Sequence, residues 1–513
     1  MSAESSRLFR ATSVADSLGI YLPASVGCRL IGLVRGVILA WLLTAEQFGL
    51  LQIALVAVNV LIPLAGAGLH EAVARYVPQY EARHALRPFL RRAWVFSILV
   101  AAVLCGLFFT AAGPLAKLVF TSYQQGATGA GQCAGLTRWI AVSSLVLIVY
   151  WLVLAALKGL RMFLAVGLLE LAGGATFTVA AVAVGLAGAR SADAMIAVQA
   201  LAYAVVVGII GSLLCRHLRR LPDQNGPLIP VANDGAAPTV WAQLVRFSIW
   251  TALAGVLWQA MQYYPMWHLQ KTHGPEATAV FGGVRLITQA VLIAATSVIM
   301  VVQATVTRTW ETQGRQAADR QLSLAFKMTA LLMLLGCGVL AVAAPLLMRL
   351  FPADYGAGAQ IIPELLAFFM VGGYLAFVVV HFVLIEKTRY VLGLWLVGVL
   401  SNAAFAHWLV RSELAPTTAL HASAWAGLLG IATALAAGLV WMRIERRPLD
   451  FGSALLIACT FALVLPGYVL GALLVLLFVM VLGSTLILDG QDKAKIRDSV
   501  SRFVKRTFKL NER

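Results

Sequence analysis

The amino-acid sequence predicts an all-α polytopic membrane protein with about 14 transmembrane helices. Three observations predict it: 61% of the 513 residues are hydrophobic, only 12% are charged, and the charges stand in short clusters between long apolar runs. Soluble domains have about 45–50% apolar and about 25% charged residues. An apolar run of roughly 20 residues is long enough to cross a bilayer as a helix. The composition therefore excludes a soluble cytosolic enzyme.

Fourteen apolar runs are candidate membrane spans. The first run is too long for a signal peptide and has no clear cleavage site, so we expect it to remain as a spanning helix. The last two runs are short, and only Pro466-Gly467 separates them. The expected spans are 17–43, 50–74, 93–113, 139–157, 162–188, 194–215, 244–268, 279–306, 326–348, 361–386, 390–410, 418–442, 452–466 and 468–488.

The distribution of Lys and Arg predicts the orientation of these spans. The chain has 39 Lys and Arg against 22 Asp and Glu, which gives a net charge of +17. With a cytoplasmic N-terminus, 30 basic residues fall in cytoplasmic segments or at the cytoplasmic ends of spans, six fall on the opposite side and three fall elsewhere within spans. This excess follows the positive-inside rule. We therefore expect both termini in the cytoplasm, and the positive charge reflects membrane topology rather than a nucleic-acid partner.

The two halves of the chain match each other at a nearly constant offset. Phe48-Gly49 matches Phe281-Gly282, and Arg75 matches Arg308, both at 233 residues. Each half holds six spans, an even number, so we expect two parallel repeats with a substrate site near the membrane midplane between them. The predicted parts are a six-helix lobe at 1–215, a cytoplasmic loop at 216–243, a second six-helix lobe at 244–442, two extra helices at 443–488 and a basic tail at 489–513.

Three arginines lie within predicted spans, away from the cytoplasmic ends of these spans. Arg29 and Arg35 are in the first span, and Arg285 is in the eighth. A central Arg costs about 2.5–3.5 kcal/mol on insertion scales, so it is expected to face a wet cavity or a partner. Guanidinium groups bind phosphate in bidentate fashion, which favours an anionic substrate. In the alternative interpretation Arg29 pairs with Glu170 or caps a carbonyl group, and the other two reach the outer surface.

The seventh span is unusually polar before Pro265. It carries Trp258, Gln259, Gln262 and Tyr263, and amides and aromatic rings are side chains that bind sugars. Proline frees backbone groups that are tolerated where they line a cavity. We therefore predict a sugar-facing segment, with an aromatic belt at the membrane interface as the alternative.

Glu170 is the candidate site for proton or ion coupling, because it lies deeper in its span than the other acidic residues. The six cysteines form no metal-binding motif, and the chain has no nucleotide-binding signature. We expect no metal and no cofactor. In the tail, Ile496, Val500 and Phe503 recur at helical spacing between basic residues. This pattern predicts an amphipathic helix on anionic phospholipid, with a solvated basic tail as the alternative.

Several segments resemble the Wzx-type polysaccharide flippases of the multidrug/oligosaccharidyl-lipid/polysaccharide (MOP) exporter superfamily. The first is Cys28-Arg29-Leu30-Ile31-Gly32-Leu33-Val34-Arg35, and the others follow in the same order at 44–49, 74–78, 157–161, 281–286 and 351–355. The first segment also looks like the first helix of the related lipid II flippases, in which arginines of the first, second and eighth helices hold a pyrophosphate. Arg35 and Arg285 stand at matching places. The second-helix arginine has no counterpart, which argues against lipid II as the substrate.

The resemblance implies two MATE-like lobes around a central cavity and no enzymatic activity. It implies that an undecaprenyl-pyrophosphate-linked oligosaccharide, a precursor of O-antigen, exopolysaccharide or capsule, is flipped across the bacterial inner membrane by alternating access. Arg29, Arg35 and Arg285 would hold the pyrophosphate, and the partners would include a polysaccharide polymerase or export complex. Two alternatives stay open: a cation-coupled multidrug antiporter of the MATE type, and a non-transporting scaffold of a polysaccharide secretion complex.

Overall fold

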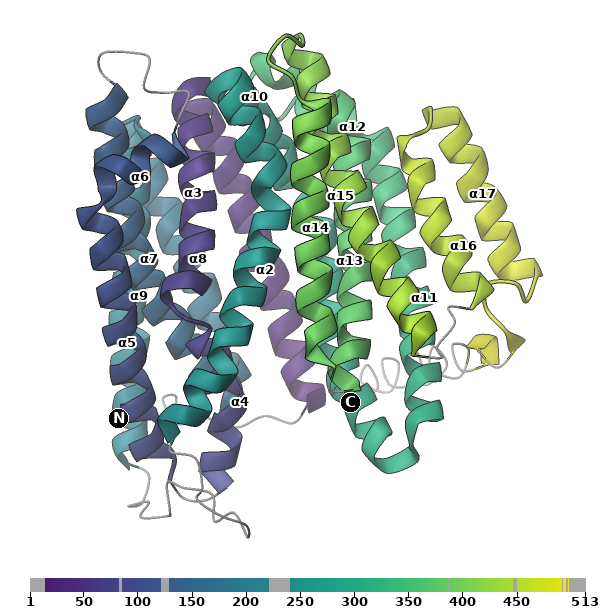
Figure 1. Cartoon of the computed structure of the whole chain (residues 1–513), viewed down its shortest axis with the longest axis horizontal. Helices are drawn as coiled ribbons and strands as arrows, with labels where there is room; N and C mark the ends of the chain where they lie inside the picture. The colour runs from purple at the N-terminus through teal and green to yellow at the C-terminus, as the bar shows by residue number, and fades with distance from the viewer. Residues whose placement is uncertain are drawn as a thin grey trace, which may run out of the picture. The chain divides into compact units, whose positions relative to one another are not determined.

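The computed structural model describes residues 14–82, 85–120, 129–220, 240–385, 387–445, 450–490, 492–494 and 497, and all regular structure in these residues is helical (Figure 1). The elements are α2 (Val14–Leu42), α3 (Ala45–Ala65), α4 (Leu69–Ala82), α5 (Leu86–Thr110), α6 (Ala112–Val119), α7 (Gly129–Gly159), α8 (Phe163–Leu186), α9 (Ala192–Arg220), α10 (Val240–Gln313), α11 (Arg315–Val342), α12 (Ala344–Met348), the 3-10 helix η2 (Ala353–Ile361), α13 (Ile362–Leu384), α14 (Thr388–Leu409), α15 (Pro416–Ile444), α16 (Phe451–Thr460), the 3-10 helix η3 (Phe461–Val464) and α17 (Gly467–Gly483).

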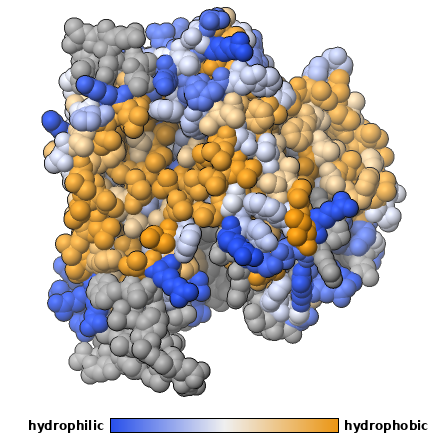
Figure 2. Space-filling model, viewed as in Figure 1, coloured by the Kyte–Doolittle hydropathy of each residue, from blue (hydrophilic) through white to orange (hydrophobic). Residues whose placement is uncertain are grey.

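The chain is an all-helical polytopic membrane protein, as predicted. Within the described residues, 11 helices are long and apolar enough to cross a membrane. One of them, Leu244–Ile299, contains both the predicted seventh span and most of the predicted eighth. Figure 2 shows apolar side chains over the middle of the helices at the left, α5 among them, with hydrophilic side chains toward the ends.

The last two predicted spans correspond to shorter apolar helices, Phe451–Val464 and Gly467–Val481. At 1.5 Å per residue, a helix of about 14 residues spans only about 21 Å. The hydrocarbon core is about 30 Å thick, so these helices are short for a complete crossing. Most of the predicted amphipathic tail, and residues 221–239 of the predicted inter-lobe loop, lie outside the described residues.

The predicted span 50–74 differs from the structure. The helix ends at Ala65, and a second helix, α4, begins at Leu69. Between them Ala67 and Gly68 have φ values of 46° and 64°, so the backbone leaves the right-handed helical region. The hydrophobic run continues through this turn, which explains why the apolar pattern alone joined the two helices.

Contacts divide the chain into two compact units. The first comprises Met1–Ile287, Arg349–Gly358 and Ala403–Ser423, and the second comprises Thr288–Met348, Ala359–Asn402 and Ala424–Arg513. These units group the chain differently from the two six-helix lobes, which stay a prediction from the sequence repeat.

In the first unit, α2 packs along α8, and α9 packs against both α7 and α8. Small residues allow the close approach of α2 and α8: a Cβ on Gly174 would lie 3.3 Å from Sγ of Cys28, and one on Gly167 would lie 2.9 Å from Cβ of Ala24. Small residues at such contacts are typical of helices that associate in membranes, where van der Waals packing replaces the hydrophobic effect.

The two matching Phe-Gly pairs of the sequence repeat both lie at the contact of α3 with α10 in the first unit. A Cβ on Gly49 of α3 would fall on the carbonyl oxygen of Pro275 in α10. A Cβ on Gly282 of α10 would lie 2.6 Å from the side chain of Gln52 in α3. Glycine at both places therefore sets the separation of the two helices.

The two close approaches fall on one side of α10. Pro275 and Gly282 are seven residues apart, which is about two helical turns, so both face α3. Between them the Thr278 hydroxyl donates a hydrogen bond to the carbonyl oxygen of Gly274 at 2.9 Å. This bond gives a partner to a backbone acceptor at the residue where the backbone leaves the helical region. The same face of α10 thus carries both the turn and the contact with α3.

In the second unit, a buried lysine holds the start of α16. Lys327 of α11 has only 7% of its side chain exposed and forms ion pairs with Asp450 and Asp492, the latter at 3.5 Å. Asp450 is also the N-cap of α16, where its carboxylate accepts a hydrogen bond from the Ser453 amide at 3.3 Å. One lysine thus joins α11 to the segments that enter α16 and follow α17.

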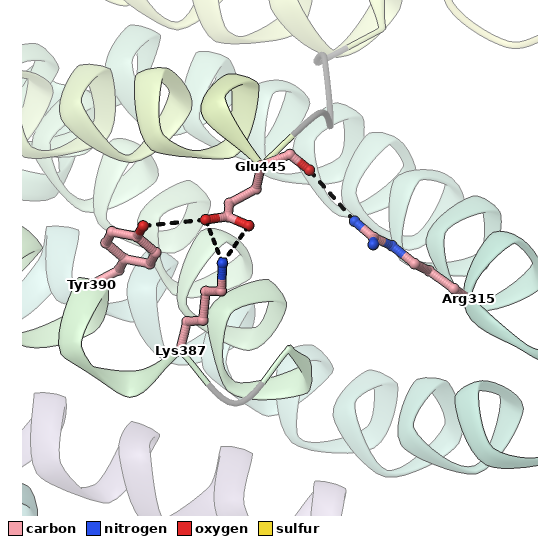
Figure 3. Close-up of polar contacts among 4 residues, drawn as sticks. All are labelled: Arg315, Lys387, Tyr390 and Glu445. Atoms are coloured by element: carbon pink, nitrogen blue, oxygen red, sulfur yellow. Dashed lines mark hydrogen bonds and ion pairs between the residues drawn. The ribbon is translucent and has the colours of Figure 1, made fainter.

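A second polar network joins the ends of three helices of this unit (Figure 3). Lys387 Nζ lies 2.6 Å from both carboxylate oxygens of Glu445, and the Tyr390 hydroxyl donates to the same carboxylate at 3.1 Å. Arg315 donates to the Glu445 carbonyl oxygen at 3.5 Å. The hydrogen bonds from Lys387 hold the pKa of the Glu445 carboxyl below its ordinary value. The network links the start of α11, the start of α14 and the end of α15.

The close contact of α3 with α10 predicts that one methyl group added at Gly49 destabilises the protein. Gly49→Ala should lower the free energy of unfolding by about 2 kcal/mol, because the new Cβ collides with backbone that cannot turn aside. The melting temperature of the purified protein in detergent measures this. Gly106→Ala is the control, since nothing lies within 4 Å of its Cβ position. Equal melting temperatures for the two variants would contradict the close approach.

The Glu445 network predicts a pH-dependent contribution to stability. A carboxyl with a lowered folded pKa stabilises the protein above its unfolded pKa, and the contribution is lost as the pH falls through the folded value. Glu445→Gln should therefore melt below the wild type at pH 7, and the difference should vanish in acid. Glu413→Gln, at an exposed position, is the control. A difference that does not change with pH would show that the ion pair is not its source.

Candidate functional site

The geometry of α10 brings together residues that are distant in sequence. In a straight helix, Gln262 and Arg285 would be about 35 Å apart, at 1.5 Å per residue over 23 residues. In the structure, Arg285 Nη1 lies 2.8 Å from the carbonyl oxygen of Gln262. The backbone leaves the helical region at Gly274, with φ 80° and ψ −172°, and Pro275 follows. The element therefore consists of two arms that fold back on each other.

Arg285 is held in a polar cradle between these arms, and only 4% of the residue is exposed. Its Nη2 donates to Oε1 of Gln262 at 3.0 Å, in addition to the bond to the Gln262 carbonyl. The guanidinium carbon lies 4.1 Å from the ring centroid of Tyr263, in a cation–π contact. Asn59 of α3 donates to the Tyr263 hydroxyl at 3.4 Å. We call Arg285, Gln262, Tyr263 and Asn59 the arginine cradle.

Arg29 and Arg35 lie elsewhere in the first unit, on α2. Arg29 is exposed, whereas Arg35 is half-buried, with its guanidinium carbon 4.2 Å from the ring centroid of Phe177 in α8. Next to Phe177, the ring of Tyr203 lies at a centroid distance of 6.3 Å. An aromatic face stabilises a cation without neutralising it. The contact with Phe177 therefore stabilises Arg35 without neutralising its charge.

Glu170 of α8 forms an ion pair with Lys158, at 3.7 Å, and 14% of its side chain is exposed. Its backbone carbonyl oxygen also accepts a hydrogen bond from the thiol of Cys28, at 3.4 Å. The sequence offered Arg29 as a partner for this carboxylate, and the structure gives it an ion pair with a lysine at the end of α7. Any role of Glu170 in coupling involves Lys158 as well.

The predicted site residues thus form two groups, the arginine cradle and the arginines of α2. Trp258 and Gln259 are half-buried and lie about one turn before Gln262 on the same arm of α10. The sequence-based prediction did not include Asn59, Phe177 or Tyr203 among the site residues. Asn59 could have been recognised from the sequence, because it is an amide within an apolar run. Phe177 and Tyr203 could not, since aromatic side chains are ordinary constituents of membrane spans.

The comparison with known families assigns the chain to a protein family. Residues 14–310 match the family described as polysaccharide biosynthesis protein. The chain belongs to this family. The matched segment contains every predicted site residue, from Arg29 to Arg285. The chain is therefore a membrane protein of polysaccharide biosynthesis.

Solved structures share the fold of this family member. A MOP superfamily transporter from Pyrococcus furiosus, described as having a binding pocket of reverse polarity, is 13% identical with a TM-score of 0.61, and the match covers 87% of this chain and 98% of that one. An outward-facing multidrug resistance MATE transporter gives the same values. A MATE transporter in a bent conformation is 15% identical with a TM-score of 0.59, covering 90% and 99%. At these identities the likeness shows a MATE-like fold. No curated protein sequence matches the chain.

The arginine cradle predicts that Gln262 is needed for stability. Gln262→Leu should lower the free energy of unfolding by about 2 kcal/mol, because it removes a bond to a buried charged donor. Thermal unfolding in detergent is the measurement. Gln259→Leu, one turn away and half-buried, is the matched control and should change little. If both variants melt alike, the bond from Arg285 to the Gln262 side chain does not contribute.

Proposed function

We propose that this protein is a flippase for an undecaprenyl-pyrophosphate-linked oligosaccharide, a precursor of O-antigen, exopolysaccharide or capsule. It acts by alternating access in the bacterial inner membrane, with both termini in the cytoplasm. The observation that carries the proposal is the position of Arg35: a charged guanidinium within a membrane span, resting on an aromatic ring, in a member of the polysaccharide biosynthesis family.

The proposed substrate contacts follow from the exposure of each residue. Arg29 is exposed and Arg35 is half-buried, so these two side chains are accessible to a pyrophosphate. Arg285 is covered by the Tyr263 ring, and it reaches the anion only after Tyr263 moves. Guanidinium groups suit a pyrophosphate because they donate two parallel hydrogen bonds to phosphate oxygens. Trp258 and Gln259, on the same arm as Tyr263, face the sugars.

Glu170 is the proposed coupling site. Uptake of a proton by its carboxylate would remove the charge that attracts Lys158. The released lysine is at the end of α7, within reach of α8. A proton gradient would in this way change the contact between two helices of the first unit.

The fold also supports a second candidate, a cation-coupled multidrug antiporter, because solved MATE multidrug transporters share it. Such a transporter binds cations and needs an acidic residue deep in its cavity. In this chain α2 carries two arginines in the corresponding part of the span. The charge of α2 therefore favours an anionic substrate over a cationic drug.

Complementation of a strain lacking this protein tests the proposal. Arg35→Ala should reduce surface glycan about tenfold or more and cause lipid-linked precursor to accumulate. Arg35→Lys should retain partial activity, because it keeps the charge but loses bidentate geometry. Arg138→Ala is the matched control, since Arg138 also lies over an aromatic ring, that of Phe109, at 5.9 Å.

Three results would argue against the flippase. Full activity of both Arg35 variants would remove the pyrophosphate role. Drug resistance on overexpression, without any change in surface glycan, would favour the antiporter. Normal glycan after replacement of Arg29, Arg35 and Arg285 together, with partner proteins still bound, would favour a non-transporting scaffold.

A further inference from the structure

A cavity of about 360 Å³ lies within the second unit, between α11, α13, α15 and α16. Its volume falls in the range of about 300–1,000 Å³ that ligand sites occupy. The transport residues proposed above are all in the first unit and do not line this cavity. Its occupant therefore has to be inferred from its own lining.

The lining of the cavity changes from polar to apolar along its helices. On α11, Asp319 and Arg320 come first, and Phe326 follows about two turns further on. On the segment that enters α16, Asp450 comes first and Ile457 is seven residues later. Each segment therefore contributes charged groups first and apolar side chains further along the helix. This gradient matches an amphiphile with a charged head and a hydrocarbon chain.

Well-packed side chains from two further helices line the apolar part. Phe377 of α13 and Leu435 of α15 are 4% and 3% exposed, and Leu439 is half-buried one turn after Leu435. These apolar walls match the chemistry of an acyl chain. Because none of these three side chains is polar, a polar ligand would lose its hydration there without replacement.

The charged end selects the headgroup. It presents one guanidinium, from Arg320, and two carboxylates, from Asp319 and Asp450. Asp450 is already bound to Lys327 but keeps 42% of its side chain exposed. The imidazole of His381 also lines the cavity. A headgroup with both a phosphate and an ammonium group finds an opposite charge for each. A pyrophosphate would instead place several negative charges beside two carboxylates, which is unfavourable.

We propose that this cavity binds a zwitterionic phospholipid with a primary amine, of the phosphatidylethanolamine type. The acyl chain occupies the apolar end, the phosphate lies against Arg320, and the ammonium group lies against Asp319 and Asp450. The predicted cytoplasmic position of the start of α11 places the charged end at the level of the lipid headgroups. The bound lipid joins α16 to the helices that precede it, and it stabilises the protein because only the folded state binds it.

The test uses the full-length protein, purified and stripped of lipid in detergent. Phosphatidylethanolamine, phosphatidylglycerol and undecaprenyl phosphate are added separately, and native mass spectrometry measures binding while melting temperature measures stabilisation. The wild type should bind phosphatidylethanolamine best and melt at a higher temperature with it. Leu439→Trp should weaken this binding about tenfold by filling the cavity. Val440→Trp, at an exposed position next along α15, is the matched control and should bind like the wild type.

A second variant tests the charged end of the cavity. Asp319→Asn keeps the shape of the side chain, so it tests the proposal even if Leu439→Trp does not fold. It should weaken phosphatidylethanolamine binding about fivefold and leave phosphatidylglycerol binding unchanged, whereas Arg443→Gln, an exposed charge outside the lining, should change neither. Equal binding by Leu439→Trp and Val440→Trp would overturn the proposal. Tighter binding of undecaprenyl phosphate than of phosphatidylethanolamine to the wild type would overturn it as well.

Discussion

The hydrocarbon of a bilayer cannot solvate a charge, and this constraint governs the polar contacts of the chain. Arginine within a span is stable only where the protein itself supplies partners. Arg285 is surrounded by a carbonyl, an amide and an aromatic ring, while Arg35 rests on one aromatic face. The two arginines differ in exposure. The partners of Arg285 enclose its charge, whereas Arg35 is only half-buried. The enclosed Arg285 contributes to stability, and the more exposed Arg35 is better placed to bind a ligand.

The arginine cradle around Arg285 depends on backbone geometry. Without the change of direction at Gly274, Gln262 and Arg285 would lie at opposite sides of the membrane. The contact of α3 with α10 fixes the second arm, because Gly49 lets the backbone of Pro275 approach α3 and Gly282 leaves room for the side chain of Gln52. Asn59 then reaches Tyr263 from α3. The polar cradle and the close helix contact are therefore parts of one arrangement.

The sequence predicted the class of fold well, because long apolar runs separated by basic clusters are typical of chains that cross a membrane many times. It singled out the arginines within spans and the polar segment of the seventh span as candidates, since polar residues stand out in an apolar background. It did not predict that Gln262 and Tyr263 enclose Arg285, because that depends on the angle at Gly274 and on rotamers. It joined α3 to α4, since hydrophobicity continues through a turn that only φ values reveal. The pairing of Glu170 with Lys158 was also missed, because it depends on how α7 and α8 meet.

The arginine cradle has a consequence for the length of α10. Gln262 is 12 residues before Gly274 and Arg285 is 11 residues after it, so the two arms reach the same level by residue count. Each residue inserted or deleted between Gly274 and Arg285 would turn the guanidinium by about 100° and shift it by about 1.5 Å. Such a change leaves composition and hydropathy almost untouched, yet it directs a charge away from its partners. The spacing of this segment is thus as much a part of the site as the identity of its residues.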